Sequence, residues 1–385
     1  MTSEIVFPYE FDSEKRKKSK IYLKQKLITG LLNGFVVPLI FLVWMIFSGF
    51  GLALEQFAFS LSSVFGIPIF VFLFLTLTEL VEFPLGFYSS YIFEHKYHLS
   101  NYSLKGWFKD FFKGLLLSYV IGIPLMSLVF FFISNFSNWW ILAWLVLTVF
   151  SVFMAFIYPV IIFPFFYKTQ PYQDQEQVQA LLAMVQKAGV KNIDRVLLAK
   201  ESEKSKKPNA MFAGMGKTKT IVLFDTLTES FTFDETQTVV AHELGHYVFK
   251  DNYRFIVLEA AALLPTLYVI NLVLQSSFVW FGIPIISLVI IPVFVLTSLV
   301  IEFFSGPIIQ AYSRHRELSA DIFALDLVEK PLAQISTEKR LADMSLADHN
   351  PNKWIEILFF SHPSSQKRID ACYAWAKEHN LKLDK

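Results

Sequence analysis

Six stretches of the chain are apolar over about 20 residues or more, the length that an α-helix needs to cross the hydrocarbon core of a bilayer. They cover residues 28–48, 57–80, 111–133, 139–165, 255–275 and 279–304. Several contain proline, which membrane helices tolerate because neighbouring helices satisfy the freed backbone groups. The pattern predicts a mainly α-helical, polytopic membrane protein with about six spans.

Polar segments around these spans divide the chain into five regions. We expect a polar N-terminal segment at 1–27, spans one to four within 28–166, a polar region at 167–254, spans five and six within 255–304, and a second polar region at 305–385. In the first polar region, residues 175–189 have helical periodicity, and 194–200, 209–213 and 219–225 are capable of forming strands. A small β-sheet is therefore expected beside the spans.

The basic residues alternate along the chain. Lys and Arg cluster before the first span, whereas the segments after spans one, three and five contain neither residue. Because cytoplasmic loops are enriched in Lys and Arg, this pattern predicts that both termini and both polar regions lie in the cytoplasm. The first 20 residues show no apolar core with a small-residue cleavage site, so no cleavable signal peptide is expected.

The composition narrows the classes of partner and metal site. Apolar residues make up 54% of the chain and charged residues 17%, against roughly 25% charged residues in a soluble domain. The net charge of +1 gives no indication of a nucleic-acid partner, and the expected surroundings are a lipid bilayer. The single cysteine, Cys372, excludes an intramolecular disulfide and a cysteine-based zinc cluster.

The sequence HELGH at 242–246 contains the His-Glu-x-x-His pattern of zinc hydrolases. A Thr-x-x-Glu capping box at Thr232 predicts the start of a helix that continues from 233 to 265 into span five. His242 and His246 are four residues apart, so both face one side of this helix and can bind one metal ion. Glu243 lies one step round the helix, where it can take a proton from a metal-bound water.

A catalytic zinc needs a third protein ligand and an open position. The metzincin pattern would require Gly at 249 and His at 252, but the chain has Phe249 and Asn252. The predicted helix at 311–327 offers Glu317 and Asp321, which are four apart and share a face. Spans five and six are expected to be antiparallel, which would bring Glu317 level with the histidines and Asp321 to the free N–H of one of them. The alternative is an acidic helix face that Arg314 and Arg316 balance.

These residues carry a resemblance to the Ste24-type CaaX prenyl proteases of the M48 zinc metalloprotease family. HELGH and SRHRELSAD resemble the two metal-binding segments of that family, and FEHKYHLSN, YPVIIFPFFYKTQPY, NAMFAG, KTIVLFDTL and SHPSSQKRI resemble further motifs in the same order. The match covers most of the chain and resembles the eukaryotic members from their second span onward.

The resemblance implies one zinc ion on His242, His246 and Glu317 in a gluzincin-like protease domain, with Glu243 as general base and Asp321 behind a ligand. It further implies that Asn209 and Ala210 pair with the substrate backbone, that Arg368 lines the cleft, and that His362 assists the oxyanion. The family fold is a ring of membrane helices that encloses a chamber. Glu79, Glu82 and Glu302 either line that chamber or lie at span ends, facing headgroups.

The activity implied is removal of the last three residues from a prenylated C-terminal CaaX sequence. The membrane would be that of the endoplasmic reticulum in a eukaryote, or the inner or plasma membrane in a prokaryote. A quality-control zinc protease similar to the HtpX-type members, without prenyl specificity, is the alternative enzyme. A catalytically inactive scaffold is disfavoured because His242, Glu243, His246 and Glu317 are all present.

Overall fold

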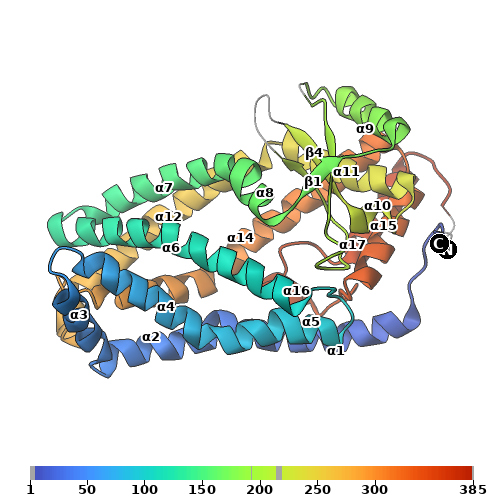
Figure 1. Ribbon diagram of the computed structural model, residues 1–385. Coiled ribbons are helices and arrows are strands. Elements are labelled where there is room, and N and C mark those ends of the chain that lie inside the picture. The colour runs from blue at the N-terminus through green and yellow to red at the C-terminus, as the bar shows by residue number, and fades with distance from the viewer. Residues whose placement is uncertain (1–4, 192, 214–218, 384–385) are drawn as a thin grey trace.

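The structure, a computed structural model, describes residues 5–191, 193–213 and 219–383. Figure 1 shows an elongated bundle of long helices, with a small β-sheet and several shorter helices gathered at one end. The fold is mainly α-helical, as the sequence predicts.

Within the described residues, six helices are long and apolar enough to cross a membrane. They span Ser13–Phe47, Gly66–Lys96, Leu104–Asn135, Trp139–Phe166, Asp251–Gln275 and Ile290–Val328. Their component elements are α1 (Ser13–Leu31) and α2 (Val37–Phe47), α4 (Gly66–Phe87) and α5 (Phe93–Lys96), α6 (Leu104–Asn135), α7 (Trp139–Ile157) and α8 (Phe163–Phe166), α12 (Asp251–Gln275), and α14 (Ile290–Val328). Single π-helical turns join α1 to α2, α4 to α5, and α7 to α8. The predicted number of spans is confirmed.

The second span begins later than predicted. Residues 57–61 belong to a separate short helix, α3 (Phe50–Leu61), and the span itself starts at Gly66. The turn between the two helices is tight. A Cβ at position 66 would lie 2.3 Å from the ring of Phe59, so the turn needs a glycine there. The hydropathy pattern alone does not reveal this turn, since the residues on both sides of it are apolar.

The sixth span also begins later than predicted, at Ile290 rather than at 279. Residues 277–281 form the short helix α13 (Ser277–Phe281), and Gly282 then adopts a left-handed conformation with φ of 69°. The following segment is irregular and partly buried, and Ser287 Oγ donates a hydrogen bond to Glu55 of α3 over 2.6 Å. The connection between spans five and six is therefore longer than the short turn that the sequence suggests.

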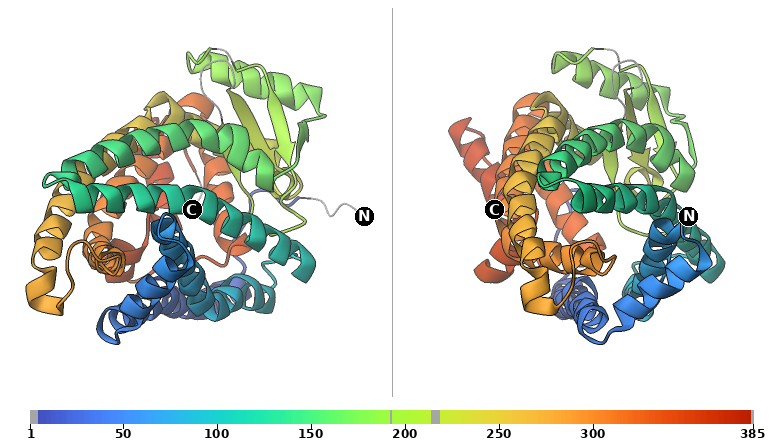
Figure 2. Two further views of the ribbon diagram at one scale, coloured as in Figure 1. Left: turned by 60° about the vertical axis from the view of Figure 1, so that its left-hand side comes forward. Right: turned by 90° about the vertical axis from the view of Figure 1, so that its left-hand side faces the viewer.

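The six long helices form a closed ring. Along the ring, α2 contacts α4, α4 contacts α6, α6 contacts α7, α7 contacts α12, α12 contacts α14, and α14 contacts α2 again. Figure 2 shows this arrangement from the end of the bundle. The ring closes with the spans that this chain contains.

One end of the ring is filled by apolar side chains. The core there brings together α2, α3, the first half of α4, the end of α6, the start of α7, the end of α12 and the start of α14. Phe70, Met45 and Ala143 are completely buried in it. This end is the left-hand end in Figure 1, opposite the sheet.

At the other end lies a sheet of four short strands in the order β1-β2-β4-β3. The strands are β1 (Thr169–Pro171), β2 (Val196–Ala199), β3 (Ala210–Ala213) and β4 (Thr220–Phe224). Strands β2 and β4 are parallel, and the other pairs are antiparallel. Strand β3 lies at the edge. All three predicted strands are present.

Short helices complete this end of the molecule. They are α9 (Gln175–Lys187), α10 (Asp225–Thr228), α11 (Phe233–Val248), α15 (Pro331–Met344), α16 (Lys353–Phe359) and α17 (Ser365–Glu378). One apolar core joins α9, the sheet, α11 and the end of α14. Residues from 167–254 and from 305–385 therefore pack into a single unit.

The predicted continuous helix from 233 to 265 is wrong. Helix α11 ends at Val248, Lys250 takes a left-handed conformation with φ of 58°, and α12 begins at Asp251. Lysine carries a Cβ and is not a residue that usually marks such a break. By contrast, α14 continues through Pro307 to Val328 without interruption.

Candidate metal centre

Two helices hold the predicted ligands. Helix α11 begins at the predicted capping box, in which Thr232 Oγ1 accepts a hydrogen bond from Glu235 N and the Glu235 carboxylate accepts one from Thr232 N. Helix α14 arrives from the membrane and packs against α11. The helices approach closely at Gly245, where a Cβ would lie 3.2 Å from Ala320 Cα. This contact explains why a glycine occupies the HELGH motif.

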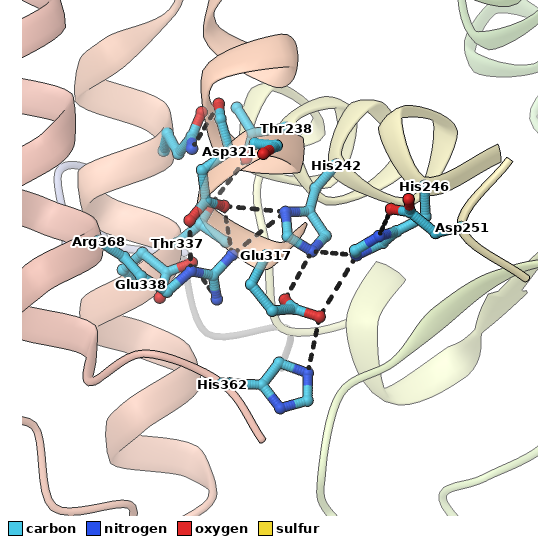
Figure 3. A network of polar contacts seen from close by, with 12 residues as sticks. Thr238, His242, His246, Asp251, Glu317, Asp321, Thr337, Glu338, His362 and Arg368 are labelled. Carbon is cyan, nitrogen blue, oxygen red and sulfur yellow. Dashed lines mark hydrogen bonds and ion pairs between the residues drawn. The ribbon is translucent and has the colours of Figure 1, made fainter. Parts of the chain in front are cut away.

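Two imidazole nitrogens and the two oxygens of one carboxylate meet between these helices, as Figure 3 shows. His242 Nε2 lies 3.2 Å from Glu317 Oε2, His246 Nε2 lies 3.4 Å from Glu317 Oε1, and the two Nε2 atoms lie 3.2 Å apart. Zinc–ligand bonds of about 2.0–2.1 Å in a tetrahedral arrangement separate neighbouring ligand atoms by roughly 3.3 Å. The nitrogen–nitrogen distance and the shortest nitrogen–oxygen distances match this spacing, and one ligand atom from each of the three residues lies within 4.8 Å of the others.

Each histidine is oriented by a carboxylate. His242 Nδ1 lies 2.8 Å from Asp321 Oδ1, and His246 Nδ1 lies 2.9 Å from Asp251 Oδ2. With Nδ1–H donating to a carboxylate, each Nε2 carries a lone pair that points toward the carboxylate of Glu317. An array of lone pairs at this spacing requires a cation, so the residues fit a bound metal ion.

Arginines support both carboxylates. Arg368 Nε donates to Asp321 Oδ2 over 2.7 Å, and Arg316 Nε donates to Asp251 Oδ1 over 2.7 Å. Burial alone would raise the pKa of Asp321, but Arg368 and His242 hold it below its usual range. Asp321 therefore stays ionised and keeps its acceptor for His242.

Glu243 borders a pocket of about 140 Å³ together with His242, Glu317 and Arg368. Burial raises the pKa of Glu243, although the two histidines oppose this shift. A raised pKa suits a carboxylate that must accept and return a proton near neutral pH.

The other predicted residues border the same pocket. Asn209 and Ala210 lie there at the start of the edge strand β3, and His362 lies there with its Nε2 3.4 Å from Glu317 Oε1. Arg368 borders the pocket, but its Nη1 also pairs with Glu338 over 2.8 Å. The structure thus brings all nine predicted site residues together.

The sequence prediction missed Asp251, Arg316 as its partner, and Glu338. Asp251 is 2% exposed and is the first residue of α12, directly after the helix break. The sequence holds one signal for Asp251, because acidic residues are favoured in the first turn of a helix. This signal can be recognised only when the helix break at Lys250 is known.

Two larger cavities flank the site. One of about 1330 Å³ extends from His246 and the end of β3 to membrane helices α7 and α12, where Phe150, Met154 and Phe255 line it. The other, of about 650 Å³, extends from His362 along α1, where Leu27 and Leu31 line it. The donor cluster therefore lies between two spaces that membrane helices border.

The comparisons with known proteins agree with this geometry. Residues 171–376 match the model of peptidase family M48, and residues 5–168 match the model of the CAAX prenyl protease N-terminal region with five membrane helices. An uncharacterized metalloprotease of Bacillus subtilis, YhfN, is 31% identical over 312 residues, which cover 78% of this chain and 71% of that protein. The CAAX prenyl protease 1 of Saccharomyces cerevisiae is 34% identical over 176 residues, or 45% of this chain and 38% of that protein.

A solved structure shares the fold. The crystal structure of S. mikatae Ste24p superposes with a TM-score of 0.81 at 25% identity, covering 94% of this chain and 89% of that chain. A family match over more than half of the chain and a fold match over nearly all of it lead to one conclusion. The chain belongs to peptidase family M48, as a membrane-embedded metalloendopeptidase.

Proposed function

We propose that this protein is a zinc endopeptidase that removes the C-terminal tripeptide from prenylated CaaX polypeptides. The observation that carries the proposal is the cluster of two Nε2 atoms and one carboxylate at zinc-ligand spacing, with Glu243 bordering the same pocket. The names of the related CAAX prenyl proteases support the substrate class.

In this proposal His242, His246 and Glu317 would hold the zinc ion. When bound, the ion would lower the pKa of a water molecule and polarise the scissile carbonyl. Glu243 takes the proton of the attacking water and returns it to the leaving nitrogen. Asp321 holds the ring of His242, and His362 donates a hydrogen bond to the oxygen that becomes negatively charged.

The substrate would lie along the edge strand β3, with Asn209 and Ala210 next to its backbone and Arg368 at the side of the pocket. The cavity of about 1330 Å³ has the apolar lining that a prenyl group needs. Phe150, Phe156 and Phe255 form part of that lining, and they come from helices that reach into the membrane.

We further propose that residues 167–254 and 305–385 form one catalytic domain on the cytoplasmic side, where both termini also lie. The shared core of α9, the sheet, α11 and α14 supports the single domain. The alternation of basic and uncharged connecting segments supports the orientation.

The test uses purified full-length protein in detergent, loaded with zinc and given a farnesylated peptide that ends in a CaaX sequence. We expect mass spectrometry to detect release of the tripeptide. Glu243→Gln should retain one zinc per chain but lose activity on the order of 10²-fold to 10⁴-fold, because the general base is removed.

Two other outcomes would contradict the proposal. Equal cleavage of farnesylated and unmodified peptides, together with cleavage of unfolded membrane proteins, would favour a quality-control protease. A protein that binds no zinc would exclude both enzymes.

A further inference from the structure

We propose that Lys26 and Lys207 form the subsite that binds the C-terminal carboxylate of the substrate. The inference rests on the proposed function. It adds a subsite that would fix the distance between the cleaved bond and the C-terminus of the substrate. It comes from the cavity of about 650 Å³, in which both lysines lie beside His362.

This cavity has an apolar wall and a basic side. Its apolar lining includes Leu27, Leu31, Phe35, Phe303 and Phe359, which come from α1, the π-helical turn after it, α14 and α16. His362 connects it to the donor cluster, since His362 Nε2 lies 3.4 Å from Glu317 Oε1. A short apolar peptide that leaves the metal centre on this side therefore enters a space of matching chemistry.

The two lysines are not equally paired. Lys207 Nζ lies 2.8 Å from Glu94 Oε2, and Tyr22 Oη donates to Glu94 Oε1 over 2.7 Å. Lys26 Nζ lies 5.4 Å from the centre of the Tyr22 ring. Within the described residues its ammonium group makes no hydrogen bond or ion pair. Lys26 thus offers an ammonium group to a ligand in the cavity.

A carboxylate of the protein also borders the cavity but does not neutralise Lys26. Asp348 Oδ1 accepts a hydrogen bond from Asn350 N over 3.2 Å and lies 3.9 Å from His349 Nδ1. No contact joins it to either lysine in the part of the chain that the structure describes. Glu94 attracts Lys26 through space but is already bound to Lys207 and Tyr22, so an incoming carboxylate would supply the direct ion pair that Lys26 lacks.

The direction in which the substrate would bind also places its C-terminus near Lys26 and Lys207. Strand β3 pairs with β4 on one side and forms the edge of the sheet on the other. A peptide that adds to this edge in the more stable antiparallel direction runs from Ala213 toward Asn209. Its C-terminal part then passes Pro208 and Lys207, which come just before Asn209 and the strand.

The spacing fits a tripeptide. Extended strands advance about 3.3 Å per residue, and antiparallel neighbours move in opposite directions along the sequence. If the first residue after the cut lies beside Asn209, the third lies beside Lys207, because the two positions differ by two residues. The terminal carboxylate of a three-residue leaving group thus reaches the basic side of the cavity.

The larger cavity also has lysines, among them Lys191, Lys219 and Lys250. Lys219 Nζ lies 5.0 Å from the centre of the Tyr247 ring. A substrate bound in the parallel direction would place its carboxylate near these residues instead. This arrangement gives the experiment a second site to compare.

The test compares two farnesylated CaaX peptides, one with a free C-terminal carboxylate and one with a C-terminal amide, on the zinc-loaded full-length protein. We expect the wild type to cleave the acid with a kcat/KM on the order of tenfold higher than that for the amide, because a hydrogen bond to a charged group discriminates by at least this factor. Lys26→Met should reduce cleavage of the acid to the level of the amide and leave cleavage of the amide unchanged. Lys26→Arg should retain the preference.

Lys24→Met is the matched control, because Lys24 is an exposed lysine on the same helix that does not border the cavity. It should behave like the wild type. Loss of the preference in Lys219→Met but not in Lys26→Met would overturn the inference in favour of the larger cavity. Equal cleavage of both peptides by the wild type, or an equal loss on both in Lys26→Met, would also overturn it while the CaaX activity stands. Failure of the wild type to release a tripeptide from either peptide would overturn the proposed function and this inference with it.

Discussion

The metal centre repeats one arrangement twice at the level of single residues. A histidine donates to an aspartate, and an arginine supports that aspartate, on both sides of the donor cluster. Both aspartates are buried, at 0% and 2% exposure. Each ring is therefore held in one orientation before the metal arrives, which reduces the cost of binding it.

Replacing the aspartate that the sequence did not reveal should weaken the site. Asp251→Asn keeps the shape of the side chain but removes the charge that orients His246 and pairs with Arg316. We expect zinc affinity to fall by roughly 10–100-fold, measured by competition with a chelator of known affinity.

Asp234→Asn provides the control for this measurement, because Asp234 lies on α11 with a half-exposed side chain that pairs with Lys330 at the surface. It should leave the affinity unchanged. An unaltered affinity in Asp251→Asn would show that His246 does not depend on its carboxylate.

The sequence could predict the residues whose spacing follows the helical period. His242 and His246 on one helix, and Glu317 and Asp321 on the other, are four residues apart and share a face. Asp251 follows His246 by five residues, a spacing that would point it to another face of a continuous helix. Its contact arises from the break at Lys250, which no glycine or proline marks in the sequence.

At the level of elements, the start of α11 depends on a buried carboxylate. Glu235 is 0% exposed, and besides the capping box it accepts hydrogen bonds from Ser336 Oγ over 2.6 Å and Arg340 Nε over 3.1 Å. Arg340 in turn lies 4.6 Å from the centre of the Tyr9 ring in the N-terminal segment. Helix α11, helix α15 and the N-terminal segment around Tyr9 are thus joined at one carboxylate.

Removing this carboxylate should destabilise the protease end of the molecule. In Glu235→Ala, the capping box is lost and Arg340 remains buried without its ion pair, at a cost of about 3–5 kcal/mol. We expect a lower midpoint of thermal unfolding in detergent and faster cleavage by trypsin. Glu229→Ala, at an exposed position before the same helix, should match the wild type. Identical unfolding of the two variants would contradict this account.

Some element boundaries could not be predicted for a related reason. Spans two and six both begin after a turn that lies within apolar sequence, so their hydropathy continues across the break. The strands and the capping box were predictable because each depends on residues adjacent in the sequence. The turns depend instead on contacts with distant elements, such as the one from Ser287 to Glu55.

At the scale of the whole molecule, the number of spans followed from the sequence but their order around the ring did not. Lipid-facing and helix-facing surfaces are both apolar, so hydropathy does not say which helices are neighbours. The closing contact joins α14 to α2, two helices at opposite ends of the membrane part of the sequence. The orientation in the membrane is a separate matter that can be tested directly.

The proposed orientation predicts which introduced cysteines an impermeant maleimide reaches. Cys372 is the sole cysteine of the chain and is buried, so Cys372→Ala provides a simple background. We expect Ser137→Cys, between α6 and α7, to be labelled in intact cells if the protein lies in the plasma membrane. Lys382→Cys should react only after the membrane is permeabilised. The reverse pattern would place the catalytic domain outside the cytoplasm.

The apolar packing at one end of the ring affects more than the stability of the bundle. Hydrolysis consumes water, and the cavities beside the metal centre border helices long enough to cross the bilayer. Buried apolar side chains such as Phe70, Met45 and Ala143 fill most of the opposite end. A water-filled active site closed at its far end by apolar side chains would not act as a pore, and the cell could keep its ion gradients while the enzyme works.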